Sequence, residues 1–175
     1  NNLKKCGIYL NQGTFILIVA FTFILILLLN TKEFLVSINQ DPDVSEYTAS
    51  YMIWYFPGLI IYGISDLYRK YLNSFRMSVI PFLSFTISVS LHPVWTYLFI
   101  VHYDFGILGI AIAGFITNFI TFSIITIFIN IEPTLKKTIV PFFDKSTFER
   151  KSLWEYTALA LPLISTCFLE VWIWE

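Results

Sequence analysis

The most unusual residue in this sequence is Glu170, an acid inside a long apolar segment of the kind that spans membranes. It lies within LISTCFLEVWIWE, well after the segment begins near Leu153. Acids at membrane depth are rare and mostly face a bundle interior or a water-filled cavity, because charge is costly in hydrocarbon. A carboxyl group in that setting could exchange a proton or bind a cation. The alternative is an acid near the outer headgroups.

The neighbours of Glu170 at helical spacing suit an organic cation. Thr166, Glu170 and Trp174 are four residues apart, so they would share one face of a helix. The carboxylate would supply charge, and the indole ring would supply cation–π attraction. Glu175 lies off this stripe and would either meet a different neighbour or remain an interfacial acid. These four residues form the predicted proton- and solute-binding set.

Three prolines inside apolar segments are candidate kinks. Pro57, Pro93 and Pro162 each remove a backbone hydrogen bond and tend to bend a helix. Such bends can act as hinges in transporters. In most membrane proteins they only shape the helix, and this is the better interpretation for any single one.

The elements that must position these residues are long apolar helices. Of the 175 residues, 57% are hydrophobic and only 13% are charged, against roughly 25% charged in soluble domains. A bilayer core needs about 20 mostly apolar residues as a helix. The sequence supplies such segments at approximately 10–36, 49–68, 79–102, 106–131 and 153–175. We therefore predict an all-α, polytopic bundle of transmembrane helices, inserted in a lipid bilayer.

The distribution of cations predicts an orientation. Five spans place successive loops on alternate sides of the membrane. Ten of the eleven Lys and Arg residues then lie on the same side as the amino-terminal segment, and Lys32 alone lies on the other side. The positive-inside rule places the ten in the cytoplasm. The loop that contains the acids Glu33, Asp41, Asp43 and Glu46 then faces outward. The net charge of −1 makes nucleic acid an unsuitable partner.

The basic segment 132–152 divides the chain. It mixes Pro133, Pro141, lysines and aromatic residues, and it is typical of a cytoplasmic linker between residues 1–131 and 153–175. An ordinary inter-helix loop that lies along the headgroups is the alternative. Elsewhere, Gly109 and Ala113 predict close helix packing, and Asp66 predicts a local charge pair with the cations that follow it.

No enzyme chemistry is indicated. His92 and His102 lack the company of other metal ligands, and neither a P-loop nor a G-x-S-x-G motif is present. We expect no metal and no cofactor beyond an ion gradient.

Several segments resemble eukaryotic multidrug and toxic compound extrusion (MATE) transporters. Residues 159–175, LALPLISTCFLEVWIWE, resemble the start of the seventh helix of that family, with Pro162, Cys167, Glu170, Trp172 and Glu175 in order and one extra residue after the Cys. YRKYLNSFRMSVIP at 68–81 is similar to the turn between helices four and five. The stretch 91–118 is similar to the passage from helix five to helix six.

The resemblance implies helices three to seven of a twelve-helix, two-lobe transporter, so we expect the chain to be part of a longer protein. Residues 1–131 would belong to the amino-terminal lobe, 132–152 to the inter-lobe linker and 153–175 to the first helix of the carboxy-terminal lobe. Two departures concern substrate choice. Gly114 stands where many members have Asn, and Asp66 and Tyr68 fall where a pattern with Gln is common.

The resulting hypothesis is a secondary-active antiporter that exports organic, cationic solutes or xenobiotics in exchange for protons. It would be monomeric when full length and would lie in the plasma membrane or a vacuolar-type membrane. A flippase of the same superfamily for a lipid-linked substrate is one alternative. A non-transporting receptor or scaffold is another, but it would give the acid Glu170 no function inside the membrane.

Overall fold

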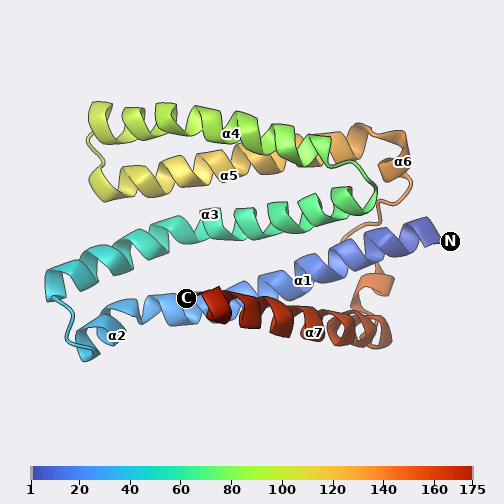
Figure 1. Cartoon of the computed structure of the whole chain (residues 1–175), viewed down its shortest axis with the longest axis horizontal. Helices are drawn as coiled ribbons and strands as arrows, with labels where there is room; N and C mark the ends of the chain where they lie inside the picture. Colours follow the sequence, from blue (N-terminus) through green and yellow to red (C-terminus); the bar gives the residue numbers. More distant parts are fainter. Residues whose placement is uncertain (1, 175) are drawn as a thin grey trace.

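The fold is a layer of long, roughly antiparallel helices (Figure 1). The computed structural model describes the backbone of residues 2–174, and it describes their side chains except at 2, 159, 163, 164, 167, 168 and 170–174. No strand occurs in this described part. The helices are α1 (Asn2–Leu29), α2 (Thr31–Ser37), α3 (Pro42–Ser74), α4 (Val79–Tyr97), α5 (Gly106–Ile131), α6 (Pro133–Lys136) and α7 (Arg150–Trp174), with a π-helical turn at Leu98–His102 and a 3-10 turn, η2, at Lys145–Phe148.

Local sequence explains where the helices begin and turn. The Asp41 carboxylate accepts hydrogen bonds from the backbone N–H groups of Asp43 (2.9 Å) and Val44 (3.3 Å), and a proline occupies the first turn of α3. Between the π-helical turn and α5, Asp104 and Gly106 have φ values of 53° and 54°. This left-handed backbone is easy for glycine. Gly106 is therefore a turn residue rather than a helix-packing residue.

Among the described residues, three helices are long and apolar enough to cross a membrane: Leu3–Leu29, Val79–His102 and Gly106–Ile131. They correspond to the first, third and fourth predicted spans. The first begins earlier than residue 10 and ends at Leu29, after which α2 is a separate short helix. The second predicted span lies inside the longer α3, where several Tyr residues and one Trp lower the mean hydropathy. The fifth lies in α7, which is only partly described.

The helices lie side by side in the order α4, α5, α3, α1, α7 (Figure 1). The main core cluster lies where the ends of α3 and α5 meet α6, and it contains Tyr71, Leu72, Ile125, Ile129 and Leu135. Elsewhere, large apolar side chains point outward, and Leu27 and Phe82 are 72% and 67% exposed. This outward apolar surface suits hydrocarbon rather than water.

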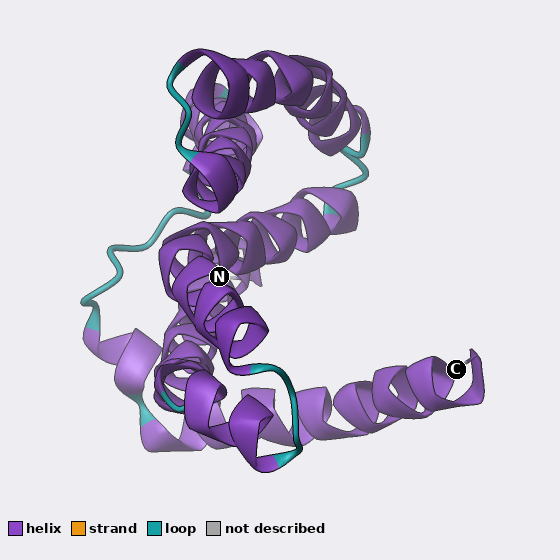
Figure 2. Cartoon of the chain, turned by 90° about the vertical axis from the view of Figure 1, so that its left-hand side faces the viewer, coloured by secondary structure: helices purple, strands orange, loops and turns teal. Residues whose placement is uncertain are grey.

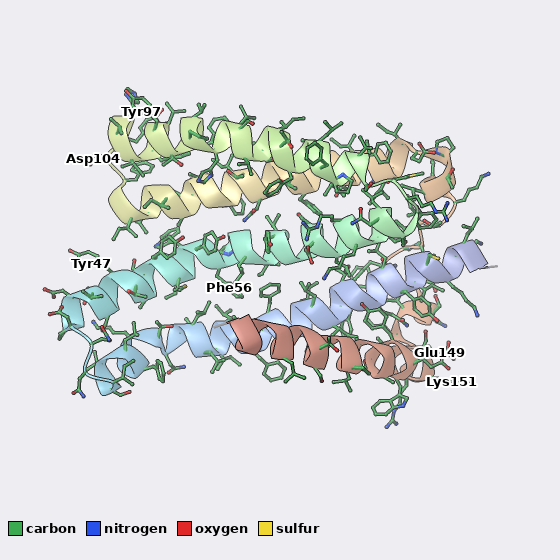
Figure 3. The ribbon with its side chains drawn as sticks, in the orientation of Figure 1. Tyr47, Phe56, Tyr97, Asp104, Glu149 and Lys151 are labelled. Atoms are coloured by element: carbon green, nitrogen blue, oxygen red, sulfur yellow. The ribbon has the colours of Figure 1, made fainter. Side chains whose placement is uncertain are left out.

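The two ends of the bundle differ in charge. The end that holds the start of α1, the α3–α4 turn, α6 and the start of α7 carries ten of the eleven Lys and Arg residues. Figure 3 shows Glu149 and Lys151 at this end, which we call the basic end, and Tyr47 and Asp104 at the opposite end. The Lys and Arg residues, which occur in alternate loops of the sequence, are thus gathered at one end of the folded bundle.

Candidate functional site

Helix α7 carries three of the four predicted binding residues, Thr166, Glu170 and Trp174. It runs without interruption from Arg150 to Trp174, so positions 166, 170 and 174 share one helix and follow at four-residue spacing. The side chains of Glu170 and Trp174 lie outside the described residues, and so does the whole of Glu175. The backbone therefore places positions 166, 170 and 174 on one continuous helix.

Thr166 and Pro162 are described, and both are exposed. The Thr166 hydroxyl donates a hydrogen bond to the Pro162 carbonyl, at 3.0 Å. Because that hydroxyl proton is engaged, Thr166 can offer a solute only the lone pairs of its oxygen. Pro162 lies inside α7, and Pro57 and Pro93 lie inside α3 and α4 in the same way. Each removes one N–H donor from its helix.

Helix α7 meets the rest of the chain near its first turns. Gln12 of α1, which is fully buried, donates to the Ser152 hydroxyl at 2.9 Å. The rings of Tyr9 and Tyr156 lie 6.3 Å apart. A Cβ added to Gly13 would lie 2.6 Å from the Tyr156 hydroxyl oxygen, so this side chain approaches the backbone of α1. Figure 2 shows α7 separating from the other helices toward its carboxyl end.

The segment before α7 packs against the bundle. Leu135, Thr138 and Thr147 are fully buried, and the Tyr71 hydroxyl forms a short hydrogen bond with the Thr138 hydroxyl. A Cβ at Gly7 would lie 1.9 Å from the Thr138 carbonyl oxygen. The backbone of this segment therefore runs directly across α1, where only glycine fits.

Two adjacent amides on α1 continue this attachment. Asn11 Nδ2 donates to the carbonyl oxygens of Val140 (3.0 Å) and Pro141 (3.3 Å). Gln12 Nε2 also donates to the carbonyl of Thr147, at 3.3 Å. Buried side chains and amide contacts therefore attach both ends of this segment to the bundle.

The turn that leads into η2 is held locally. The Asp144 carboxylate accepts hydrogen bonds from the Ser146 hydroxyl and from the Ser146 backbone N–H, the latter at 2.9 Å. These bonds, the hydroxyl first, hold the pKa of the Asp144 carboxyl below its ordinary value. The ionised form of this carboxyl is thus the one that holds the turn.

A second polar region lies between α3, α4 and α5, and sequence reasoning missed it. A pocket of about 140 Å³ there is lined in part by Ser65, Thr117, Asn118 and Thr121. Asn118 Nδ2 donates to the Gly58 carbonyl at 3.2 Å, so one of these polar groups ties α5 to α3. The cluster of hydroxyl and amide residues within an otherwise apolar α5 was the signal that could have located it.

Asp66 also lines this pocket, and its charge pair is confirmed. Its carboxylate contacts Arg69 and, at 3.0 Å, the Lys70 ammonium. His92 Nδ1 lies 2.8 Å from the Thr117 hydroxyl oxygen, which itself donates to the Ala113 carbonyl. The ring nitrogen is therefore the donor in that contact. Within the described part of the chain, no three His, Cys, Asp or Glu side chains are grouped as metal ligands.

The order of helices, the apolar outer surface and the basic end agree with the resemblance described above. The sequence model of MatE matches residues 1–98, which is more than half of the chain. The chain belongs to the MatE family. It is an integral, multi-pass membrane protein.

Curated MatE relatives align along almost the whole chain. Protein DETOXIFICATION 17 of Arabidopsis thaliana is 24% identical over 172 residues, covering 98% of this chain and 35% of that protein. Multidrug and toxin extrusion protein 1 of Mus musculus is 28% identical over 176 residues, covering 99% of this chain and 30% of that protein. The chain spans about a third of the length of these relatives.

The fold matches that of a solved MatE protein. The crystal structure of the eukaryotic MATE transporter AtDTX14 superposes with a TM-score of 0.82 at 18% sequence identity, covering 92% of this chain and 35% of that one. At this identity the match establishes the fold. The all-α bundle predicted from the sequence is thus confirmed.

Proposed function

We propose that the full-length protein is a secondary-active antiporter that exports organic, cationic solutes in exchange for protons. Residues 1–131 would form part of its amino-terminal lobe and 132–152 the linker. The first helix of its carboxy-terminal lobe would be 153–175, which begins within the first turn of α7. The observation that carries the proposal is an acid at position 170 of an uninterrupted helix in a chain of the MatE family. The names of the relatives, which refer to multidrug and toxin extrusion, support it.

The mechanism follows from competition at one carboxylate. An ionised Glu170 attracts a cation, whereas protonation removes the charge and releases it. Two unit charges 4 Å apart attract by about 4 kcal/mol at an effective dielectric of 20. That energy corresponds to about a thousandfold in affinity. Protonation from one side of the membrane and proton release to the other would then drive the solute the opposite way.

Thr166 and Trp174 complete the proposed site on α7. Thr166 would offer an oxygen acceptor, since its proton is bonded to the Pro162 carbonyl. Trp174 would offer a ring face, two turns from Thr166 on the same stripe. Glu175 would serve a separate proton or solute contact. The protein would lie in the plasma membrane or a vacuolar-type membrane and would act as a monomer.

Replacing Glu170 tests this function. In the full-length protein, Glu170→Gln is isosteric but cannot ionise, so proton-driven efflux of tetraethylammonium from proteoliposomes should fall at least a hundredfold. The amount of folded protein should not change. Glu155→Gln is the matched control, because Glu155 is an exposed acid on the same helix at the basic end. Normal efflux by the Glu170 variant would refute the proposal, and lipid translocation without cation efflux would favour a flippase.

A further inference from the structure

A pocket at the basic end lies between four parts of the fold. Its volume is about 320 Å³, and its wall is formed by α1, α3, α5 and the segment 138–142 that follows α6. That segment lies directly on α1, because a Cβ at Gly7 would be 1.9 Å from the Thr138 carbonyl oxygen. Ligand pockets are usually about 300–1,000 Å³ in volume. This pocket therefore has room for a small molecule or for one end of a longer one.

One hydroxyl in the wall of this pocket differs from its neighbours. Of the four Ser and Thr residues of α5, three donate to the backbone carbonyl four residues earlier: Thr117, Thr121 and Ser123. Thr126 is the fourth. Its hydroxyl oxygen is buried and has no hydrogen-bond partner in the part of the chain that the structure describes. A buried polar group without a partner is destabilising, so a bound molecule that satisfies Thr126 gains from the contact.

Other polar groups around the pocket offer mainly oxygen lone pairs. The Thr138 hydroxyl donates to the Leu135 carbonyl at 2.6 Å, so the Tyr71 hydroxyl is the donor in its bond to Thr138. The Asn11 amide donates to the Val140 carbonyl at 3.0 Å, which leaves the Asn11 side-chain oxygen as an acceptor. A molecule that suits these groups must bring a hydrogen-bond donor.

The wall of the pocket carries no charge. None of the described residues that line it is Lys, Arg, His, Asp or Glu, and many are apolar: Leu10, Ile129, Ile139, Val140, Pro141 and Phe142. A cation would find no carboxylate here and would meet the positive potential of the basic end. An anion would find few donors to replace its hydration. A neutral molecule with an apolar body and a hydroxyl group meets neither obstacle.

We propose that this pocket binds a neutral, largely apolar molecule whose hydroxyl group forms a hydrogen bond with Thr126. Two sources supply this chemistry: the membrane, as the hydroxyl end of a sterol, and the aqueous phase, as a small phenol. The site is separate from the stripe on α7, and it does not rest on the proposed antiport function. A molecule bound there touches α1, α3, α5 and the segment 138–142 together, so it stabilises their packing.

Binding of matched probes to the full-length protein tests the site. The hydroxyl probes are cholesterol and 2-naphthol, and the controls are cholesteryl methyl ether and 2-methoxynaphthalene, which keep the apolar body but lack the donor. The protein is held in sterol-free lipid nanodiscs, and partition into empty nanodiscs is subtracted. At least one hydroxyl probe should bind saturably and about tenfold more tightly than its ether, the worth of one hydrogen bond.

The outcome identifies the source. Saturable binding of cholesterol alone assigns the pocket to the membrane, binding of 2-naphthol alone assigns it to a small phenol, and binding of both shows a pocket open to either. Equal affinity for alcohol and ether, or no saturable binding of either alcohol, would overturn the proposal.

A threonine exchange tests the assigned contact. Thr126→Val removes the hydroxyl and nearly keeps the shape of the side chain, so it should weaken binding of the hydroxyl probe about tenfold and leave binding of the ether unchanged. Thr22→Val is the matched control, because the Thr22 hydroxyl bonds the Ile18 carbonyl of its own helix at 3.0 Å and lies outside the pocket. Full binding by the Thr126 variant, or an equal loss in both variants, would contradict the assignment.

Photolabelling locates the probe without any change to the pocket. A diazirine derivative of the probe that binds should label residues 126–130 and 138–142, and unmodified probe should prevent the labelling. Labels confined to other segments would refute the site. Excess tetraethylammonium should not reduce the labelling, since the wall is uncharged, and displacement by this cation would contradict a neutral site. A protein that binds the hydroxyl probe but transports no tetraethylammonium would keep this site and lose the antiporter.

Discussion

One exposed ion pair joins α2 and α3 at the end of the bundle opposite the basic end. The Lys32 ammonium of α2 lies 2.8 Å from the Glu46 carboxylate of α3. A hydrogen bond from Lys32, and then its charge, lowers the pKa of the Glu46 carboxyl, and the same bond and charge raise the pKa of Lys32. The Glu46 contribution is present above its unfolded pKa, about 4.3, and is lost as pH falls through the folded value. The Lys32 contribution is present below about 10.4 and is lost as pH rises.

The pair therefore stabilises the α2–α3 contact between about pH 5 and pH 10. Glu46→Gln should lower the thermal midpoint of the full-length protein slightly at pH 7 in low salt, and high salt should remove the difference, because an exposed pair is screened. Fluorescence-monitored melts at two salt concentrations measure this. Glu33→Gln should have a smaller effect, since Glu33 acts on Lys32 only through its charge. A deficit that persists in high salt would show that the pair is not the cause.

At the scale of elements, the contact between the π-helical turn and α5 depends on a glycine. A Cβ at Gly109 would lie 3.0 Å from the carbonyl carbon and oxygen of Phe99, which belong to the backbone of that turn. A Cβ at Gly114 would lie 2.9 Å from an edge atom of the Tyr55 ring. The two distances are nearly equal, but a ring can shift and a backbone carbonyl cannot do so without moving the turn.

We expect only one of the two alanine variants to lower stability. Gly109→Ala should destabilise by about 1–3 kcal/mol, as overpacking does. Gly114→Ala should be neutral or stabilising, because alanine gains about 0.5–1 kcal/mol over glycine in a helix. Thermal unfolding of the full-length protein in detergent provides the measurement. An equal loss in both variants would mean that the ring is held as firmly as the backbone.

Helix bounds could be predicted from the sequence where an apolar run has clear residues at both of its ends. Helix α5 occupies Gly106–Ile131, the same residues as the predicted span, because its apolar run is bounded by a glycine turn and by Glu132 before Pro133. The first span was placed less well, since hydropathy does not register the break at Asn30 that separates α2 from α1. The docking of the segment between α5 and α7 against α1 was also missed. It depends on Asn11 and Gln12 meeting residues well over a hundred positions away, and no local pattern encodes such a contact.

For the candidate site, the four-residue spacing of Thr166, Glu170 and Trp174 on α7 could be read from the sequence. The polar pocket between α3, α4 and α5 could not. The polar groups of α5 that line the pocket with Asp66 were missed because Thr and Asn are tolerated inside membrane helices through bonds to their own backbone, as Thr117 bonds the Ala113 carbonyl. Only the packing of α3 and α4 against α5 shows that these side chains gather around one cavity.

At the scale of the whole molecule, the separation of charge between the two ends predicts the orientation in the membrane. Each cation of the basic end would have to cross the bilayer if the protein were inverted, and cytoplasmic loops carry the excess of Lys and Arg. The opposite end has Lys32 with Glu33, Asp41, Asp43 and Glu46, so its cation is outnumbered by acids. The basic end should therefore face the cytoplasm.

Labelling of single cysteines in whole cells tests this orientation. Ser37→Cys, at the end of α2, and Lys145→Cys, in η2, are both exposed and lie at opposite ends of the bundle. With Cys6 and Cys167 replaced by Ala in the full-length protein, a membrane-impermeant maleimide should label Ser37→Cys in intact cells. It should reach Lys145→Cys only after permeabilisation. The reverse pattern would place the basic end, and with it the Tyr156–Gly13 contact, on the outer side of the membrane. If the protein lies in an internal membrane, both sites are shielded in intact cells, and selective permeabilisation of the plasma membrane should then expose Lys145→Cys alone.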